Sequence, residues 1–319
     1  MEVNKIYHDD GMNNQLPDKS VNLILADPPY FEVKGSFDFV WKSFDEYLID
    51  VEKWAKECKR LLADNGTLFW YGHAKKIAYA QVIFDKLFCL ENNIAIEFNR
   101  QTKKGVEEFR CFAPVSERLL MYSTGNDYHD NVRLAIKYIH DYLNTITTRN
   151  ELAEILLQIG NCRNYESAKQ NANNILSQKS AKPQMITKFQ YELIPNTNKK
   201  DYETLKQEYE NLRTEYEELR RPFNNFKKLF DIMSFDQEAH ITGKYEHETC
   251  KPETLTRALI LTCSRENDLV FVPFAGSGTE VAMAIKEGRN AIGFDIEEKY
   301  VKMGNKRTDI IKAQPSLFF

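Results

Sequence analysis

Residues 23–30 read Leu-Ile-Leu-Ala-Asp-Pro-Pro-Tyr, and the rest of the chain is arranged around this stretch. The apolar run predicts a buried parallel strand whose carboxyl end delivers Asp27 and Tyr30 to one edge of a sheet. Pro28 and Pro29 fix the backbone and remove two N–H donors, so the main-chain carbonyls there are presented as acceptors beside the carboxylate. Acceptors gathered in this way favour an amine as the ligand.

An exocyclic amine of a nucleobase fits these groups. It would donate to the Asp27 carboxylate and to the Pro28 carbonyl, while the base stacks on the ring of Tyr30. The alternative is an ordinary strand end followed by a Pro-Pro turn. The tetrapeptide alone leaves both interpretations open.

The composition indicates a globular protein of moderate size. With 319 residues, 42% hydrophobic and 28% charged, the chain is long enough for one sizeable α/β core and a smaller module. No apolar run reaches membrane length, so we expect a cytoplasmic protein without a membrane partner. No two of the six cysteines have the spacing of metal ligands, which predicts thiols in a reducing compartment and no metal site.

The charge of the chain is distributed unevenly. A formal net charge of −4 is a mild argument against binding to nucleic acid. Residues 161–200, however, carry seven Lys and Arg against two acids, which makes this segment a candidate phosphate-facing surface. The seven basic residues are Arg163, Lys169, Lys179, Lys182, Lys188, Lys199 and Lys200.

Strands and helices alternate over the first 123 residues. Ser43 and Glu46 form a capping box before a run of apolar residues at helical spacing, which predicts a helix after the central strand. We expect a second helix over 74–88 and further strands at 3–7, 67–71, 93–98 and 118–122. This alternation predicts an α/β fold with a mostly parallel sheet and helices on both faces.

Polar helices replace the strands from about residue 130 to 244, which indicates an inserted module. Two short helices, over 152–157 and 167–176, flank a turn at Gly160. This pattern suits a helix-turn-helix-like module in which the amides of Asn171 and Asn174 pair with adenine edges. The alternative is a solvated helical insertion with no contact to nucleic acid.

The segment 201–221 predicts a long charged helix with an apolar seam at alternating spacings of three and four. We expect the seam to pack on its own module, with a homodimer interface as the alternative. Seven acids against four bases would repel phosphates, so this helix should face away from nucleic acid.

A second centre follows the strand predicted over 268–272. The sequence Pro-Phe-Ala-Gly-Ser-Gly-Thr at 273–279 leads into a helix, and the next strand, over 291–294, ends at Asp295. Glycines between a strand and a helix let the backbone approach a ligand closely, and an acid after the next strand is placed to receive ribose hydroxyls. The pattern predicts a nucleoside-containing cofactor.

Taken together, the two centres resemble the amino-methylating DNA methyltransferases that use S-adenosylmethionine, and in particular their circularly permuted β class. That class places the catalytic motif first, the target-recognition region second and the cofactor motif last. The resemblance covers residues 1–123 and 244–308 and implies a Rossmann-like methyltransferase sheet. It implies a catalytic half at 1–129, a target-recognition insertion at 130–244 and a cofactor-binding half at 245–319.

The resemblance also implies roles for individual residues. The catalytic motif consists of Asp27, Pro28, Pro29 and Tyr30. The residues expected at the cofactor are Asp10, Asp27, Lys251, Phe274, Gly276, Ser277, Gly278, Thr279 and Asp295, with Lys251 in the family's His-x-x-x-Lys-Pro element at 247–252. In the insertion we expect DNA contacts from Lys169, Asn171, Asn174, Lys179 and Lys182.

The chain departs from the family pattern at two positions. Val272 stands where the family usually has Asp immediately before Pro-Phe, which bears on cofactor affinity. The acid after the following strand is Asp295, where Glu is more frequent.

The activity implied by the resemblance is transfer of a methyl group from S-adenosylmethionine to N6 of a flipped-out adenine in double-stranded DNA. Asp at position 27 favours adenine, since the family more often has Ser there when cytosine N4 is the target. Methylation of cytosine N4 remains an alternative, as does an RNA or protein-glutamine methyltransferase, although these normally place the cofactor loop first. Because of Val272, a catalytically inactive DNA-binding relative is a further alternative. A role in restriction-modification implies a cognate restriction endonuclease as a candidate partner.

Overall fold

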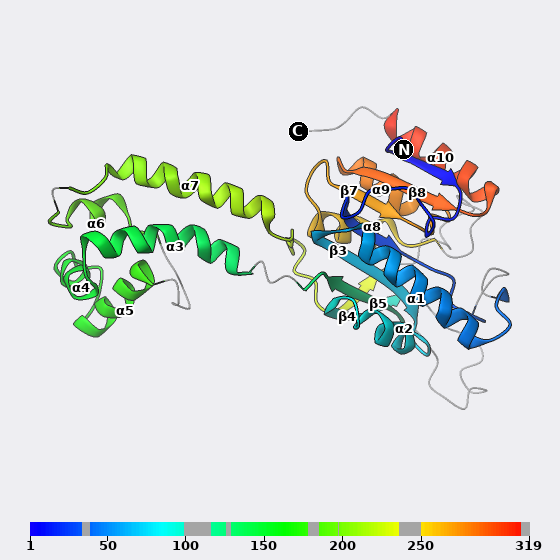
Figure 1. Ribbon diagram of the computed structural model, residues 1–319, viewed down its shortest axis with the longest axis horizontal. Coiled ribbons are helices and arrows are strands. Elements are labelled where there is room, and N and C mark those ends of the chain that lie inside the picture. Colours follow the sequence, from blue (N-terminus) through cyan, green and yellow to red (C-terminus); the bar gives the residue numbers. More distant parts are fainter. Residues whose placement is uncertain are drawn as a thin grey trace. The chain divides into compact units, whose positions relative to one another are not determined.

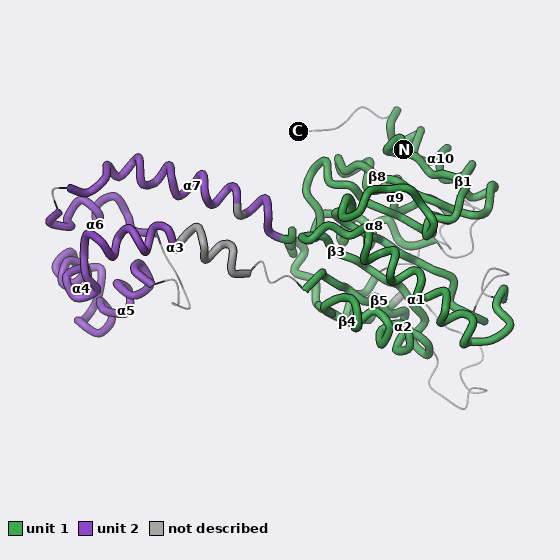
Figure 2. The backbone as a smooth tube through the Cα atoms, in the orientation of Figure 1, with its two compact units in different colours: residues 1–126, 221–319 green, residues 127–220 purple. Residues whose placement is uncertain are grey.

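The computed structural model describes residues 1–33, 39–98, 116–125, 129–177, 185–196, 198–235 and 250–313. Lys179, Lys182 and His247, which the sequence singles out, lie outside these ranges. The chain forms two compact units, shown in different colours in Figure 2. Unit 1 comprises Met1–Asn126 and Arg221–Phe319, and unit 2 comprises Asp127–Arg220.

Unit 1 contains an eight-stranded sheet (Figure 1). Its order is β1 (Lys5–His8), β8 (Asn290–Asp295), β7 (Leu269–Val272), β2 (Val21–Ala26), β3 (Leu62–His73), β5 (Ser116–Ser123), β4 (Cys89–Phe98) and β6 (Ile232–Phe235). Every neighbouring pair is parallel except the two pairs that involve β5, which runs in the opposite direction. The predicted fold class, an α/β protein with a mostly parallel sheet, is confirmed.

Helices cover both faces of this sheet, as the alternation predicted. On one face, α1 (Phe44–Leu61) and α2 (Ile77–Phe84) bury Val51, Ala55 and Phe84 against the strands. On the other, α8 (Glu253–Cys263), α9 (Thr279–Lys286) and α10 (Glu298–Lys312) contribute to a separate core that includes Leu255, Val281 and Val301. The sequence did not single out α10.

The topology brings several chain segments to one edge of the sheet. Because β2, β7 and β8 are parallel, Asp27, Pro273 and Asp295 lie at or just after their carboxyl ends on the same side. Strand β5 is reversed, so its first residues reach that edge as well. The register shows this directly, since Glu117 is opposite His73 at the end of β3.

Unit 2 is helical and has its own apolar core. It consists of α3 (His129–Ile146), α4 (Arg149–Gln158), α5 (Tyr165–Leu176), α6 (Lys188–Glu192) and α7 (Tyr202–Leu219). Leu205 of α7 is fully buried in this core, with Leu143 of α3 and Leu156 of α4. The apolar seam of α7 therefore packs on its own unit, which was the favoured interpretation of its sequence.

The end of the inserted segment differs from the sequence prediction. The module was expected to extend to residue 244, but unit 2 ends at Arg220 and β6 belongs to the sheet of unit 1. Strand β6 has only four residues, pairs with β4 alone and leaves Ile232 69% exposed, so it is too short for its sequence to distinguish it from a loop. None of the helices in the described ranges has the length and apolar character needed to span a membrane.

Candidate active site

Lys251 joins the residues of the Asp-Pro-Pro-Tyr motif to a second carboxylate. Its Nζ lies 3.0 Å from Asp27 Oδ1, 2.9 Å from Glu117 Oε2 and 3.2 Å from the hydroxyl oxygen of Tyr30. The Tyr30 hydroxyl in turn donates to Asp27 Oδ1. Only 5% of the Lys251 side chain is exposed, so the ammonium group is held inside the protein by three oxygen acceptors.

Burial and charge act against each other in this cluster. Burial raises the pKa of Asp27, while the nearby Lys251 ammonium opposes that rise. Burial alone would lower the pKa of Lys251, but the negative charges of Asp27 and Glu117 outweigh it and raise the pKa instead. Lys251 is therefore held in its charged form, and it favours the ionised form of Asp27.

Glu280 adds a third carboxyl group close to this cluster. It lies in the first turn of α9 and is 6% exposed. Burial, together with the negative charge of Asp27, raises the pKa of Glu280 to about 7. Neither Glu280 nor Glu117 stands out in the sequence, because each lies among ordinary helix or strand residues outside the motifs.

The backbone turns sharply directly after the motif. Phe31 and Glu32 have φ values of 40° and 52°, in the left-handed region that non-glycine residues rarely adopt. Phe31 is nevertheless buried and packs against Phe44 and Tyr47 at the start of α1. This aromatic packing holds the strained turn and so fixes the direction in which the chain leaves Tyr30.

The loop between β7 and α9 requires glycine at two positions. Gly276 and Gly278 have φ values of 47° and 72°, and a Cβ on Gly278 would lie 2.7 Å from Cα of Gly304. The main-chain N–H of Gly276 donates to Asp295 Oδ2 at 2.8 Å, and Asp295 Oδ1 accepts from the N–H of Glu297 at 2.8 Å. Asp295 thus fixes the loop to the end of β8.

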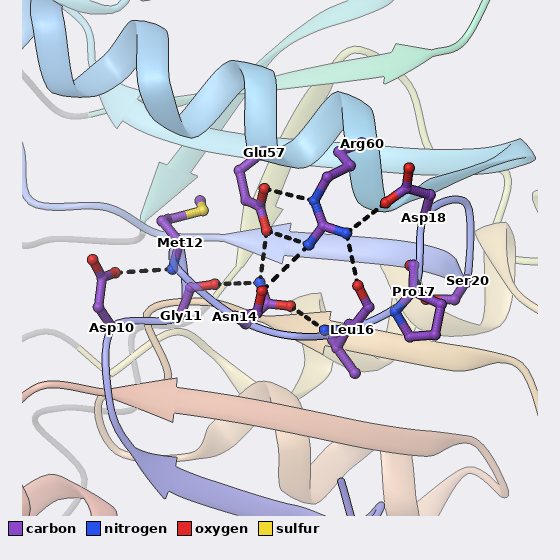
Figure 3. A network of polar contacts seen from close by, with 10 residues as sticks. All are labelled: Asp10, Gly11, Met12, Asn14, Leu16, Pro17, Asp18, Ser20, Glu57 and Arg60. Atoms are coloured by element: carbon purple, nitrogen blue, oxygen red, sulfur yellow. Dashed lines mark hydrogen bonds and ion pairs between the residues drawn. The ribbon is translucent and has the colours of Figure 1, made fainter.

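Asp10 lies in a second loop at the same edge, between β1 and β2 (Figure 3). Its Oδ1 accepts from the N–H of Met12 at 2.9 Å. Gly11 is packed so closely that a Cβ there would lie 2.6 Å from the carbonyl oxygen of Pro273, which brings this loop to the start of the glycine-containing loop. Arg60 of α1 anchors the far part of the loop, where it donates to the carbonyl of Leu16 at 2.7 Å.

The residues around these two loops fit a nucleoside-containing cofactor. Asp10 and Asp295 supply carboxylates that can accept hydroxyl or amine hydrogens. Asp295 contacts the glycine-containing loop, and Asp10 lies in the neighbouring loop between β1 and β2. The ring of Phe274 is partly exposed and lies 5.1 Å from the ring of Trp54. The N-terminus of α9 provides main-chain N–H groups for an anionic part of the ligand. Ser277 and Thr279 are buried and bond to each other, so their contribution is to the shape of the loop.

The model of the DNA methylase family N6_N4_Mtase matches residues 21–306, most of the chain and both of the centres described above. This chain belongs to the DNA methylase family. The expected family is confirmed, whereas nothing in the match separates the β class from the others. The fold agrees with this family, because the edge of the sheet brings together the loops that were predicted to hold S-adenosylmethionine.

Individual relatives are similar over nearly the whole chain. The DNA adenine methyltransferase YhdJ of Escherichia coli strain K12 is 26% identical over 97% of this chain and 84% of its own length. The type II methyltransferase M.HpaI of Haemophilus parainfluenzae is 25% identical over 92% of this chain and 70% of its own. Both cover unit 1 and unit 2.

Solved structures show the same fold at lower sequence identity. The cytosine-N4-specific PvuII DNA methyltransferase has a TM-score of 0.55 at 12% identity and covers 96% of this chain and 89% of its own. The complex of M1.HpyAVI with S-adenosylmethionine has a TM-score of 0.53 at 16% identity and covers 95% and 98%. The cofactor expected from the sequence is therefore one that a protein of this fold binds.

One departure of this DNA methylase from the family pattern has a clear structural setting. Val272, in place of the usual Asp, is the last residue of β7 and is 1% exposed. Its side chain belongs to the core on the α8 and α9 face. The loop after β7 is fixed by Asp295 from the neighbouring strand, so the chain keeps a carboxylate on this loop even though position 272 is apolar.

In unit 2, several side chains that were predicted to contact DNA are bonded to other residues of the same unit. Lys169 lies 3.6 Å from Glu166, and the Nδ2 of Asn171 donates to Sγ of Cys162 at 3.2 Å. Asn174 is 8% exposed, and its Oδ1 accepts from Gln170, so its side chain serves the packing of α5. Three further lysines of the segment 161–200 are engaged within the unit, namely Lys188 with Glu203, Lys199 with carbonyls at the end of α6, and Lys200 with Glu208.

Proposed function

We propose that this DNA methylase is adenine-specific and transfers the methyl group of S-adenosylmethionine to the N6 amine of adenine in DNA. The observation that carries the proposal is the half-buried Asp27 carboxylate, directly before Pro28, at the edge that also holds the glycine-containing loop. Tyr30 and Lys251 both contact Asp27 on Oδ1, and the proposal assigns Oδ2 to the amine of the base. The name of the relative YhdJ supports adenine as the base.

The N6 amine of adenine is a poor nucleophile because its lone pair is delocalised into the ring. Asp27 and the Pro28 carbonyl would each accept one amine hydrogen, which favours a tetrahedral nitrogen with a localised lone pair. S-adenosylmethionine, when bound, supplies a methyl group on a positively charged sulfur. As the N–C bond forms, the C–S bond breaks and its electron pair remains on the sulfur.

The methylated nitrogen then carries one proton too many. Asp27 is the base in contact with it, and takes that proton to give neutral N6-methyladenine and a neutral carboxyl group. Because burial raises the pKa of Asp27, the carboxyl group is a better proton acceptor than an exposed aspartate would be. The proton leaves to solvent when the product dissociates.

Tyr30 receives the base in this proposal. Its hydroxyl donates to Asp27 Oδ1 in the structure, so a base entering the site meets a tyrosine that is already fixed by a hydrogen bond. The aromatic ring offers a stacking surface for an adenine that has been rotated out of the duplex. Extrusion of the base is required because the amine is hidden inside the duplex.

Unit 2 is proposed as the target-recognition part of the enzyme. Helix α5 begins after a turn that contains Gly160, with a φ of 73°, and Asn164 caps it. Lys169 and Asn171 of α5 remain candidate contacts, together with Lys179 and Lys182, whereas the buried Asn174 is not included. Double-stranded DNA is the proposed partner, and a homodimer and a cognate restriction endonuclease stay proposals.

The test is transfer of tritium from labelled S-adenosylmethionine to duplex DNA, followed by nucleoside analysis. We expect label in N6-methyladenine. Label in N4-methylcytosine would replace adenine by cytosine as the target. Label only in RNA or protein, or no transfer by a folded protein that binds the cofactor, would contradict the proposal.

A further inference from the structure

Glu117 touches the candidate active site but has no part in the chemistry described so far. It is the second residue of β5, the one reversed strand of the described sheet, and for that reason it reaches the edge at which Asp27 lies. Its Oε2 accepts from Lys251 at 2.9 Å, while the same ammonium group donates to Asp27 at 3.0 Å. Two carboxylates thus share one buried cation.

The charge of this cluster explains why a second carboxylate matters. A Lys251–Asp27 pair alone would be neutral, and the ammonium group would compete with an incoming amine for the negative charge of Asp27. With Glu117 present, the three groups together keep one net negative charge. That charge faces an amine that becomes positive during methyl transfer, which is the condition under which an anionic acceptor contributes most.

We propose that Glu117 is a positioning residue for methyl transfer, which rests on the proposed function. By sharing Lys251, it prevents the ammonium group from neutralising Asp27, and it holds the lysine at a fixed place between the two carboxylates. Glu117 does not touch the base in this arrangement and acts through Lys251. Without the Glu117 charge, the ammonium group, which already lies 3.0 Å from Asp27 Oδ1, would have Asp27 as its one carboxylate partner among the described residues.

Other titratable groups face the same cluster from neighbouring elements. The ring of Tyr71 on β3 lies 4.8 Å from Nζ of Lys251, and His73 on the same strand is opposite Glu117. Glu280 of α9 interacts with Asp27 through its charge, and Arg307 of α10 interacts with Glu280. These groups, and Tyr30, are unchanged when Glu117 is replaced, so a shift in pH dependence on its replacement reports the loss of the Glu117 charge from this cluster.

The test compares Glu117→Gln with the wild-type enzyme in single-turnover methyl transfer to duplex DNA over a range of pH. Glutamine keeps the size and an acceptor oxygen but removes the charge. We expect the plateau rate to fall about tenfold, since Lys251 then pairs with Asp27 alone. We expect the acidic limb of the profile to move to lower pH, because loss of a like charge lowers the pKa of Asp27. Glu117→Asp should recover part of both effects.

A second measurement does not depend on turnover. In protein labelled with ¹³C at the aspartate carboxyls, the Asp27 signal, assigned with Asp27→Asn, should titrate at lower pH in Glu117→Gln than in the wild type. Glu97→Gln, at an exposed position on the adjacent strand β4, is the matched control and should change neither readout.

The outcomes separate this inference from the proposed function. If the wild-type enzyme methylates DNA and Glu117→Gln keeps both the plateau rate and the acidic limb, Glu117 has no positioning role. A slower variant with an unmoved acidic limb and an unmoved Asp27 titration assigns Glu117 to the fold alone and equally overturns the inference. If the wild type fails to methylate DNA, the proposed function is lost, and the Asp27 titration still decides whether Glu117 controls that carboxylate.

Discussion

A lysine at the candidate active site of unit 1 and two lysines on unit 2 form opposite kinds of ion pair. In unit 1, Lys251 is 5% exposed and makes contact with two carboxylates and a tyrosine hydroxyl. In unit 2, Lys188 and Lys200 are 55% and 37% exposed, and each pairs with one glutamate at 2.9 Å. A buried ammonium group costs several kcal/mol unless its partners are well placed, whereas an exposed pair contributes about 0–1 kcal/mol.

A buried lysine of the first kind determines the charge environment of a site, whereas an exposed lysine of the second kind can exchange its carboxylate partner for another anion. A buried cation held by three acceptors cannot leave without a large penalty, so it sets the electrostatics of the groups around it. An exposed lysine can exchange a carboxylate for a DNA phosphate at little cost. Four substitutions test that contrast, from the largest expected effect to the smallest.

Asp27→Ala should have the largest effect, because it removes the acceptor that matters most in the transition state. We expect single-turnover methyl transfer to fall by at least about 10²–10³-fold, while the affinity for S-adenosylmethionine stays within a few fold. Lys251 keeps Glu117 as a partner, so the variant should fold. Asp27→Asn retains an acceptor oxygen without the charge and should lose less activity. Transfer near the wild-type rate in Asp27→Ala would remove the motif from the chemistry.

Asp295→Ala should act on binding instead. Asp295 accepts from the main chain at Gly276 and Glu297, so the variant loses both the order of the glycine-containing loop and an acceptor for the ribose. We expect the dissociation constant of S-adenosylmethionine, measured by calorimetry, to rise by an amount equivalent to about 1–3 kcal/mol. Asp309→Ala, at a largely exposed position on α10, is the control. An unchanged affinity in a folded Asp295→Ala protein would place this residue outside the cofactor site.

The parts of the site that the sequence predicted are those that local patterns determine. Asp27 and Asp295 each follow an apolar strand, and carboxyl ends of parallel strands meet at one edge, so their place could be inferred from the residue pattern alone. Glu117 could not be inferred in this way. It opens a strand instead of ending one, and it reaches the edge only because β5 runs in reverse.

The same limit applies in unit 2. Asn171 and Asn174 looked equivalent in the sequence, but Ala168, Ala172 and Ile175 set the buried stripe of α5 and take Asn174 with them. Charge counting over 161–200 gave a basic segment, yet Lys199 is used to cap α6, where it donates to the carbonyl of Ile194. Local composition predicts the sign of the net charge on a surface, but it does not predict which charged side chains are already paired with other groups of the same unit.

Glu280 offers a pH-dependent test of the buried site. Burial raises the pKa of Glu280 to about 7, above the ordinary value of 4.5. Between these two pH values the carboxyl group is protonated in the native state and ionised in the unfolded state. Stability therefore falls as pH rises from about 4.5 to 7 and levels off above that. Glu280→Gln has no such proton. Urea unfolding of both proteins should show the variant gaining up to about 3 kcal/mol relative to the wild type between pH 5 and 8. The exposed Glu266→Gln variant is the control, and a pH-independent difference for Glu280→Gln would mean that Glu280 does not carry this proton.

Lys169→Gln should have the smallest effect, and it tests a lysine of unit 2 that is 32% exposed, in contrast to the 5% of Lys251. Its Nζ lies 3.6 Å from Oε1 of Glu166, three residues earlier on α5, and the two side chains are 32% and 84% exposed. Losing this pair should therefore change the free energy of unfolding by less than about 1 kcal/mol. If Lys169 exchanges Glu166 for a phosphate, the variant should bind every DNA sequence more weakly, and the slope of log K against log salt should decrease by about one unit. Lys302→Gln on α10 removes a comparable surface pair with Glu298 in unit 1 and should leave the slope unchanged.

The measurement is binding to duplex DNA at several salt concentrations. An unchanged slope for Lys169→Gln would mean that this lysine only stabilises its own helix, and the proposed DNA-binding face of α5 would lose its one described lysine.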